Sequence, residues 1–137
     1  MTEEETYDGI GIADLRVDSV SWTPAQAEHV RTRSGRYPGA FDIEPEWATE
    51  AALNPGRRFG LDPASKSGEG IRVIGRSEAA GRALTVILIP EEHPPAGAWP
   101  GVTAWAARGR DLREHEAHEI GYEAGDEDEA EGGGTSR

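Results

Sequence analysis

The sequence predicts an α+β fold with two N-terminal helices, an antiparallel sheet of three or four strands, and a C-terminal helix. Two observations lead to this prediction. β-branched residues are dense only in residues 71–74 and 84–89, and a Ser-Glu-Ala-Ala-Gly connection lies between these runs, which is the pattern of a β-hairpin. Helix-start residues precede two stretches nearer the N-terminus, and a helix-compatible stretch follows Arg110.

The predicted hairpin has two different faces. The run 84–89 is apolar at consecutive positions, so we expect a central strand covered on both sides. Pro90 ends this strand because proline cannot donate a hydrogen bond to a sheet. In the preceding run, Arg72 and Arg76 share one face, whereas Val73 points to the other. One side of the hairpin is therefore predicted to be core and the other cationic.

The remaining elements follow from local start and stop residues. Thr23 is a good N-cap and proline suits the first helical position, so the first helix is predicted over 24–33. The second helix is predicted from Glu44 or Pro45 to Leu53. The other predictions are short strands at 19–22, 57–61 and 102–106, loops at 62–70 and 91–101, and a closing helix from 110 to about 120.

Charge divides the chain into a core and two tails. The 137 residues carry a formal charge of −12 and contain 36% hydrophobic residues, enough for one small domain. Five of the 26 acids lie in residues 1–14 and seven in 119–137, whereas 13 of the 14 lysines and arginines lie in 15–118. The sequence therefore predicts one domain at 18–120 between acidic flexible tails at 1–17 and 121–137.

Composition also limits the chemistry. The chain has no cysteine, which excludes disulfides and thiolate nucleophiles, and no phosphate-binding glycine motif opens a helix. His115 and His118 have a spacing that permits metal binding, but the interleaved glutamates favour a solvated helix face, so no metal and no cofactor are predicted. No apolar run reaches the ~18 residues that span a bilayer, and the N-terminus lacks a basic start. We therefore expect a soluble cytoplasmic protein without a membrane partner.

Several short motifs, in order along the chain, resemble the BrnT toxin family. The match covers about residues 20–118. Its motifs are Trp22-Thr-Pro-Ala-Gln, Arg33-Ser-Gly, the segment Ile43 to Pro55, Arg72-Val-Ile-Gly-Arg-Ser, Gly81-Arg, Leu84-Thr-Val, Val102-Thr-Ala and Asp111-Leu-Arg. The resemblance implies a RelE-like fold and a type II toxin–antitoxin toxin that cleaves RNA without metal. It also implies a small ribbon-helix-helix antitoxin as the neutralising partner, through which an oligomer could form.

The resemblance carries over to individual residues, with two departures. Arg33 stands where the family usually has lysine in a Lys-His-Gly motif, and Ser34 replaces the histidine of that motif. Arg72 matches the arginine of the hairpin, and Arg113 matches an arginine that opens the last helix. Trp105 stands where the family tends to have an arginine in the last strand.

Elementary chemistry allows the same activity. Metal-free RNA cleavage needs a base near the 2′-hydroxyl, a cation at the phosphate and an acid for the leaving oxygen. Arg72 is the predicted ligand of the scissile phosphate, with Arg33 and Arg113 in support. His29 shares a helical face with Arg33 and is the candidate base.

Three further residues are candidates for RNA binding. Arg76 shares the cationic strand face with Arg72, and Lys66 lies on the preceding loop. Trp105 could stack on a base. Each candidate also has a structural alternative: a solvated strand face for the arginines, an ordinary helical position for His29, and core packing for Trp105.

Two functions from different classes remain open at this point. One is an RNA-cleaving toxin, which the hairpin arginines favour. The other is a catalytically lapsed BrnT-like protein-binding module, held by a ribbon-helix-helix partner that also contacts DNA. Ser34 and Trp105, at the two changed positions, favour the second.

Overall fold

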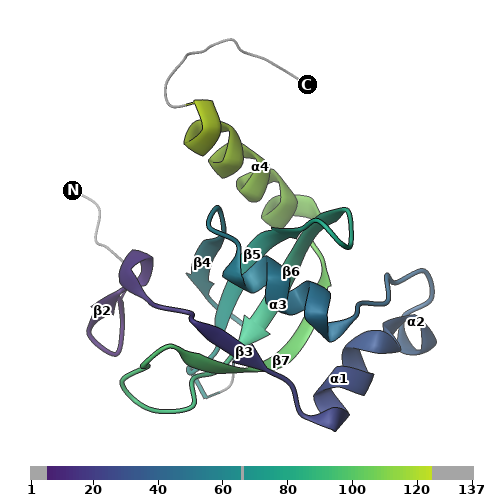
Figure 1. Ribbon diagram of the computed structural model, residues 1–137, viewed down its shortest axis with the longest axis horizontal. Coiled ribbons are helices and arrows are strands. Elements are labelled where there is room, and N and C mark those ends of the chain that lie inside the picture. The colour runs from purple at the N-terminus through teal and green to yellow at the C-terminus, as the bar shows by residue number, and fades with distance from the viewer. Residues whose placement is uncertain (1–5, 66, 125–137) are drawn as a thin grey trace.

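The computed structural model describes residues 6–65 and 67–124 and shows an α+β fold around a five-stranded mixed sheet with strand order β3-β7-β6-β5-β4 (Figure 1). A separate two-stranded sheet, β1 with β2, precedes it. The strands are β1 Thr6–Tyr7, β2 Ile10–Gly11, β3 Ser19–Ser21, β4 Arg58–Leu61, β5 Ile71–Ser77, β6 Arg82–Leu88 and β7 Ala98–Ala106. The helices are η1 Ile12–Asp14, α1 Pro24–Arg31, α2 Arg33–Arg36, α3 Pro45–Leu53 and α4 Gly109–Ala124.

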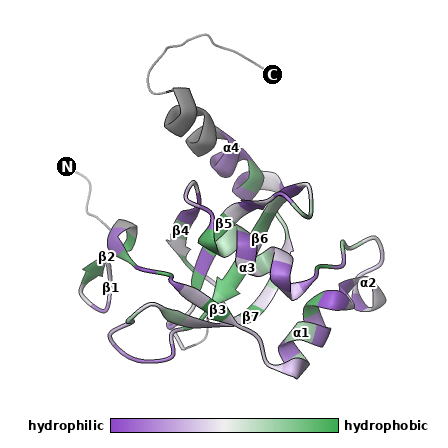
Figure 2. Ribbon diagram, in the orientation of Figure 1, coloured by the Kyte–Doolittle hydropathy of each residue, from purple (hydrophilic) through white to green (hydrophobic). Residues whose placement is uncertain are grey.

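The β5–β6 hairpin forms as its sequence pattern predicts. The two strands pair antiparallel from Ile71↔Leu88 to Ser77↔Arg82, and β6 lies at the centre of the sheet with residues 83–88 buried. Figure 2 shows these central strands as largely hydrophobic and α2 as hydrophilic. Residues that alternate along β5 therefore face two different environments.

Local capping explains where the helices begin. The side chain of Thr23 accepts a hydrogen bond from the backbone N–H of Gln26, and Pro24 occupies the first position of α1. Pro45 likewise occupies the first position of α3. Val30 in α1 is fully buried, and its carbonyl accepts from the N–H of Ile43, which ties the segment before α3 to α1.

Helix α3 lies on the sheet (Figure 1), and it contacts β5 at Gly75. A Cβ at this position would overlap the carbonyl oxygen of Ala51, so only glycine permits the observed approach. The carboxylate of Glu50, the residue before Ala51, accepts from the Ser77 hydroxyl at 2.7 Å and from the N–H of Glu78 at 3.1 Å. The same helix thus fixes both the strand and its turn.

The predicted layout of the fold is wrong both in its sheet and in its order of elements. The sheet has five strands and is mixed, because β3 pairs parallel with β7 at Ser19↔Ala98. This strand precedes the helices, and a further short helix, α2, follows α1, so two helices followed by an antiparallel sheet do not describe the chain. The error arose because the hairpin pattern is local, whereas the β3–β7 pairing joins distant segments and leaves no local trace.

Residues 6–17, expected to belong to an acidic tail, are packed against the domain in the structure. Tyr7, Leu15 and Val17 are buried in the main core. The indole N–H of Trp99 donates to the carbonyl of Arg16 at 2.7 Å, and Trp99, expected in a loop, is 1% exposed. Sparse apolar residues among the acids therefore suffice to anchor this segment.

Strand β7 begins at Ala98 rather than at the predicted residue 102. Trp22 and Trp47 are partly buried and pack against the main core. Lys66, residues 1–5 and residues 125–137 lie outside the described part of the chain. Among the helices of residues 6–65 and 67–124, none has the length and apolarity to cross a membrane.

The contact at Gly75 gives a direct test of the packing. Gly75→Ala should lower the free energy of unfolding by about 1–3 kcal/mol, because the added methyl forces α3 away from the sheet. Gly35→Ala in α2 is the matched control, since nothing lies within 4 Å of its Cβ position. Chemical denaturation measures both, and equal stability of the two variants would contradict the proposed contact.

Candidate functional site

The sheet has a second face, opposite α3, on which the polar candidates lie. Pairing places Arg72 beside Ile87, which is itself beside Thr103, and places Thr85 beside Ile74 and Trp105. Helix α4 covers part of this face, where Leu112 packs against Ile74, Ala83 and Ala107. The face is thus divided between a region under α4 and a region near α2.

Under α4, Arg72 is held in a half-buried ion pair. Its Nη1 lies 3.0 Å from Oδ1 of Asp111, with 18% and 16% of the two side chains exposed. The Thr85 hydroxyl donates to the other carboxylate oxygen at 3.3 Å. Arg72, the predicted ligand of the scissile phosphate, is therefore paired with α4, and Asp111 balances its charge.

The region near α2 contains a cationic pocket, which we call the arginine pocket. Its cavity has a volume of about 410 Å³. It is lined by Arg33, Tyr37, Pro38, Gly39, Ala40, Trp105 and Arg108. The pocket thus combines two guanidinium groups with two aromatic rings and a small-residue loop.

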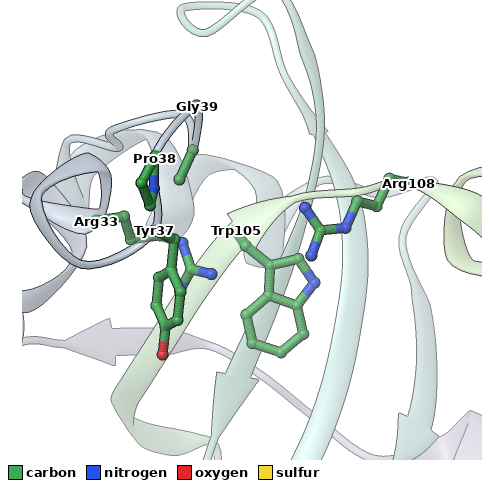
Figure 3. Close-up of a pocket in the computed structure, with 7 residues that line it drawn as sticks. Arg33, Tyr37, Pro38, Gly39, Trp105 and Arg108 are labelled. Carbon is green, nitrogen blue, oxygen red and sulfur yellow. The ribbon is translucent and has the colours of Figure 1, made fainter.

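Arg33 contacts both aromatic rings of the pocket. Its Cζ lies 4.9 Å from the ring centroid of Tyr37 and 5.6 Å from that of Trp105. Figure 3 shows the two rings with the Arg33 side chain beside them, and Arg108 extending toward Trp105 from the opposite side. Tyr37 remains 53% exposed, so its ring is accessible to a ligand.

The positive charge in and around the pocket comes from Arg33 and Arg36 in α2 and from Arg108 before α4. Burial lowers the pKa of Arg33 from its ordinary value, and the charges of Arg36 and Arg108 act in the same direction, although the guanidinium remains charged. Arg36 also contacts the Tyr37 ring, at 5.9 Å from its centroid. Such mutual repulsion is relieved when an anion enters.

A smaller cavity of about 210 Å³ adjoins the arginine pocket and shares five of its residues: Arg33, Gly39, Ala40, Trp105 and Arg108. It is also lined by Phe41 and Arg82. The Arg82 guanidinium lies 4.1 Å from the Phe41 ring centroid. The aromatic and cationic surface therefore continues from α2 to the start of β6.

His29 lies beside this charged group but does not line the cavity. Its carbonyl accepts a hydrogen bond from Nη2 of Arg36 at 2.6 Å. Burial lowers the pKa of its imidazole below the ordinary 6.5, and Arg36 and Arg33 lower it further. His29 is thus mainly neutral at pH 7, the state in which an imidazole can accept a proton.

The structure brings some predicted site residues together and separates others. Arg33 and Trp105 are in contact and His29 is electrostatically coupled to Arg33. Arg76 pairs with Glu78 at 3.2 Å, and Arg113 is exposed on α4, outside the residues that line the pocket. Lys66 lies outside the described residues.

Sequence reasoning missed three residues of the pocket and its extension. Tyr37 and Arg108 lie outside regular strands, and Arg82 lies at a strand end. Tyr37 lies in the segment Ser-Gly-Arg-Tyr-Pro-Gly, whose glycine and proline residues predict a loop but give no signal for a binding residue. Loops carry binding residues in many proteins because they are accessible and are positioned by a rigid scaffold.

A second polar cluster lies far from the pocket in sequence and joins the β1–β2 turn to two loops. Nδ1 of His93 lies 2.8 Å from Oδ2 of Asp8, and Nε2 lies 3.8 Å from Oε1 of Glu69. The hydrogen bond with Asp8 raises the pKa of His93 above the ordinary 6.5, and Glu69 adds to this. Within residues 6–65 and 67–124, no group of His, Cys, Asp and Glu has the arrangement of a metal site.

Comparison with known proteins gives no assignment. No protein-family model and no curated protein matches the chain. The geometry and charge of the arginine pocket are therefore the observations on which a function can rest.

The two arginines of β5 should differ in their effect on stability. Arg72→Ala leaves the half-buried Asp111 without its cation and should lower the free energy of unfolding by about 1–3 kcal/mol. Arg76→Ala, the matched control on the same face, removes an exposed pair and should cost about 0–1 kcal/mol. Urea denaturation compares them; an Arg72→Ala variant as stable as Arg76→Ala would contradict a structural role for Arg72.

The two histidines with shifted pKa values should give opposite pH dependences. The pKa of His93 is raised, so its contribution to stability is complete below pH 6.5 and is lost as pH rises through the folded-state value. The pKa of His29 is lowered, so folding is penalised as pH falls below 6.5. Unfolding of His93→Gln and His29→Gln, each compared with the parent from about pH 5.5 to 8.5, should show differences of opposite slope. Parallel curves would contradict this assignment.

Proposed function

We propose that this chain is an RNA-cleaving toxin of a two-component toxin–antitoxin pair, as its resemblance to the BrnT family implies. The observation that carries the proposal is the arginine pocket, where Arg33 and Arg108 meet the rings of Tyr37 and Trp105. Guanidinium groups bind phosphate through paired hydrogen bonds, and aromatic rings stack on unpaired bases. RNA offers both groups in every nucleotide.

Arg33 in the arginine pocket and Arg82 in the adjoining cavity stack on aromatic rings, and within the described residues no carboxylate forms an ion pair with either. Outside these cavities, Arg57 makes the same kind of contact with Phe59. By contrast, Arg31 pairs with Glu44 and Arg72 pairs with Asp111. A stacked guanidinium keeps its charge available for a phosphate, whereas an ion-paired one does not.

The proposed chemistry uses the same charges in the transition state. Arg33 and Arg108 would stabilise the negative charge that develops on the phosphorane, without metal. His29, close to the charges of Arg33 and Arg36 and mainly neutral at pH 7, is the candidate to take the proton of the attacking 2′-hydroxyl. The attack forms a 2′,3′-cyclic phosphate and breaks the bond from phosphorus to the 5′-oxygen, which takes a proton from water. His29 does not line the cavity, so the bound RNA would have to extend toward α1.

Ser34 has a structural role that accounts for its departure from the family pattern. Its backbone N–H and its hydroxyl donate to the two oxygens of Asp42, at 2.7 and 2.9 Å. Both hydrogen bonds lower the pKa of Asp42, which stays ionised. Ser34 thus orders the loop that carries Tyr37 rather than contributing a reactive group.

A binding module without catalysis is the second candidate. The observation that favours it is the Arg72–Asp111 pair, because the arginine that matches the family's hairpin position has its charge balanced within the chain. Such a module would bind a small antitoxin-like, ribbon-helix-helix partner. Co-purification with the partner, without any RNA cleavage, would be its signature.

The proposal predicts growth arrest on inducible expression without the partner, accompanied by RNA decay. Arg108→Ala should reduce the cleavage rate by about 10²–10³-fold, because one cation at the developing charge is lost. Arg110→Ala is the matched control: it removes the same charge two residues away, where the side chain pairs with Glu114 outside the pocket.

Cleavage of purified RNA and growth curves measure the effect. Folding is checked by circular dichroism, so that a loss of activity is not confused with a loss of structure. A folded parent chain that neither arrests growth nor cleaves RNA would refute the toxin and leave the binding module. Equal activity of the two arginine variants would exclude Arg108 from the site.

A further inference from the structure

We infer that the arginine pocket holds one unpaired nucleotide, with its base stacked on Trp105 or Tyr37 and its phosphate bound by Arg33 or Arg108, so that the substrate is single-stranded RNA. This inference rests on the proposed function and specifies the substrate class of the same site. Four observations carry it: cavity size, ring accessibility, the placement of the cations, and the adjoining cavity.

The size of the pocket fits one nucleotide rather than a duplex. Its volume of about 410 Å³ lies near the lower end of small-molecule sites, which span about 300–1,000 Å³. The walls come from α2, the loop after it and the end of β7. A base pair inside a helix cannot enter such a recess without leaving its stack.

The rings of the pocket are presented in the way that stacking requires. Tyr37 is largely exposed, and Trp105 is half-buried on an open part of the sheet face. The guanidinium of Arg33 covers one face of each ring, so a base stacks on a face that Arg33 leaves open, as on the 53% exposed Tyr37. In duplex RNA the base faces are covered by neighbouring bases, so only an unpaired base can use these rings.

The cations lie on both sides of Trp105. Arg33 approaches the ring from α2, and Arg108 extends toward it from the residue that precedes α4 (Figure 3). A nucleotide with its base on Trp105 therefore has a guanidinium available on either side for its phosphate. This arrangement binds a base and a phosphate together, which a simple anion site does not.

The adjoining cavity is the place where a bound RNA strand continues beyond the arginine pocket. It shares Trp105 and both of these arginines with the arginine pocket and adds Phe41 and Arg82. A second nucleotide can occupy this space of about 210 Å³ only in part, with its phosphate near Arg82. Alternating cations and aromatic rings along a groove are typical of proteins that bind single strands.

The test uses the full chain and a single-stranded hexanucleotide with 2′-O-methyl groups, which cannot be cleaved through the 2′-hydroxyl. Binding should quench tryptophan fluorescence in the parent and should weaken by about 5–100-fold in Trp105→Leu, the range expected for loss of one stacking contact. Trp105→Phe should restore part of the lost affinity. Leu61→Ala, which alters another exposed apolar side chain outside the arginine pocket, should bind like the parent.

Three comparisons decide the ligand class. The same sequence annealed to its complement should bind at least tenfold more weakly, and inorganic polyphosphate should compete poorly because it offers charge without bases. Equal binding of duplex, effective competition by polyphosphate, or unchanged affinity in both Trp105→Leu and Tyr37→Leu would overturn the inference. Tyr37→Leu serves as the second variant because that ring is exposed and its loss threatens folding least.

Failure of the inference and failure of the proposed function give different results. If the chain cleaves unmodified RNA but Trp105→Leu and Tyr37→Leu bind and cleave like the parent, the inference is wrong and the ribonuclease stands. If the hexanucleotide binds and quenches as expected while RNA stays intact, the nucleotide site is supported and the ribonuclease is refuted. Absence of any binding overturns the inference.

Discussion

The rest of the structure depends on one close contact, the approach of α3 to β5 at Gly75. Because this residue has no Cβ, the backbone of Ala51 can lie directly on the strand, and Glu50 is brought within hydrogen-bonding distance of the β5–β6 turn. The position of α3 in turn sets the position of α1, through the bond between Ile43 and Val30. Helix α2 follows α1 directly, so the position of Arg33 beside Trp105 follows from this contact.

Helix α4 gives the other face of the sheet two different chemical characters. Where it covers the strands, Asp111 balances Arg72 and Leu112 completes a small apolar cluster. Where α4 begins, Trp105 is left uncovered, and Arg108, the residue before the helix, lines the pocket. A single helix therefore neutralises one arginine and leaves space around others, which is why charge on this face cannot be judged from strand periodicity alone.

Local patterns in the sequence were enough for the hairpin, for α1 and for α3, because proline, capping residues and β-branched runs act within a few positions. Local patterns were not enough for the β3–β7 pairing or for the burial of Tyr7 against Trp99, because each of these contacts joins segments that are distant in the sequence. The ring centroids of Tyr7 and Trp99 lie 5.9 Å apart. The same limit applies to the site. Arg33 and Trp105 could be selected as candidates, but the exposure expected for Arg72 depended on Asp111, which only the folded chain brings near.

The acidic net charge of the chain is compatible with a cationic pocket, because the two act on a phosphate over different distances. The formal charge of −12 opposes the approach of a polyanion at long range, but at physiological salt charges more than about 8 Å apart are largely screened. What a phosphate meets at short range is set by Arg33, Arg82 and Arg108, and aromatic rings hold the first two of these apart from carboxylates. Stacking is less sensitive to salt than charge pairing, so a site that combines both retains affinity where a purely cationic patch on an acidic protein would lose it. The aromatic rings therefore have two effects: they keep the guanidinium groups available, and they supply the part of the binding energy that the net charge does not oppose.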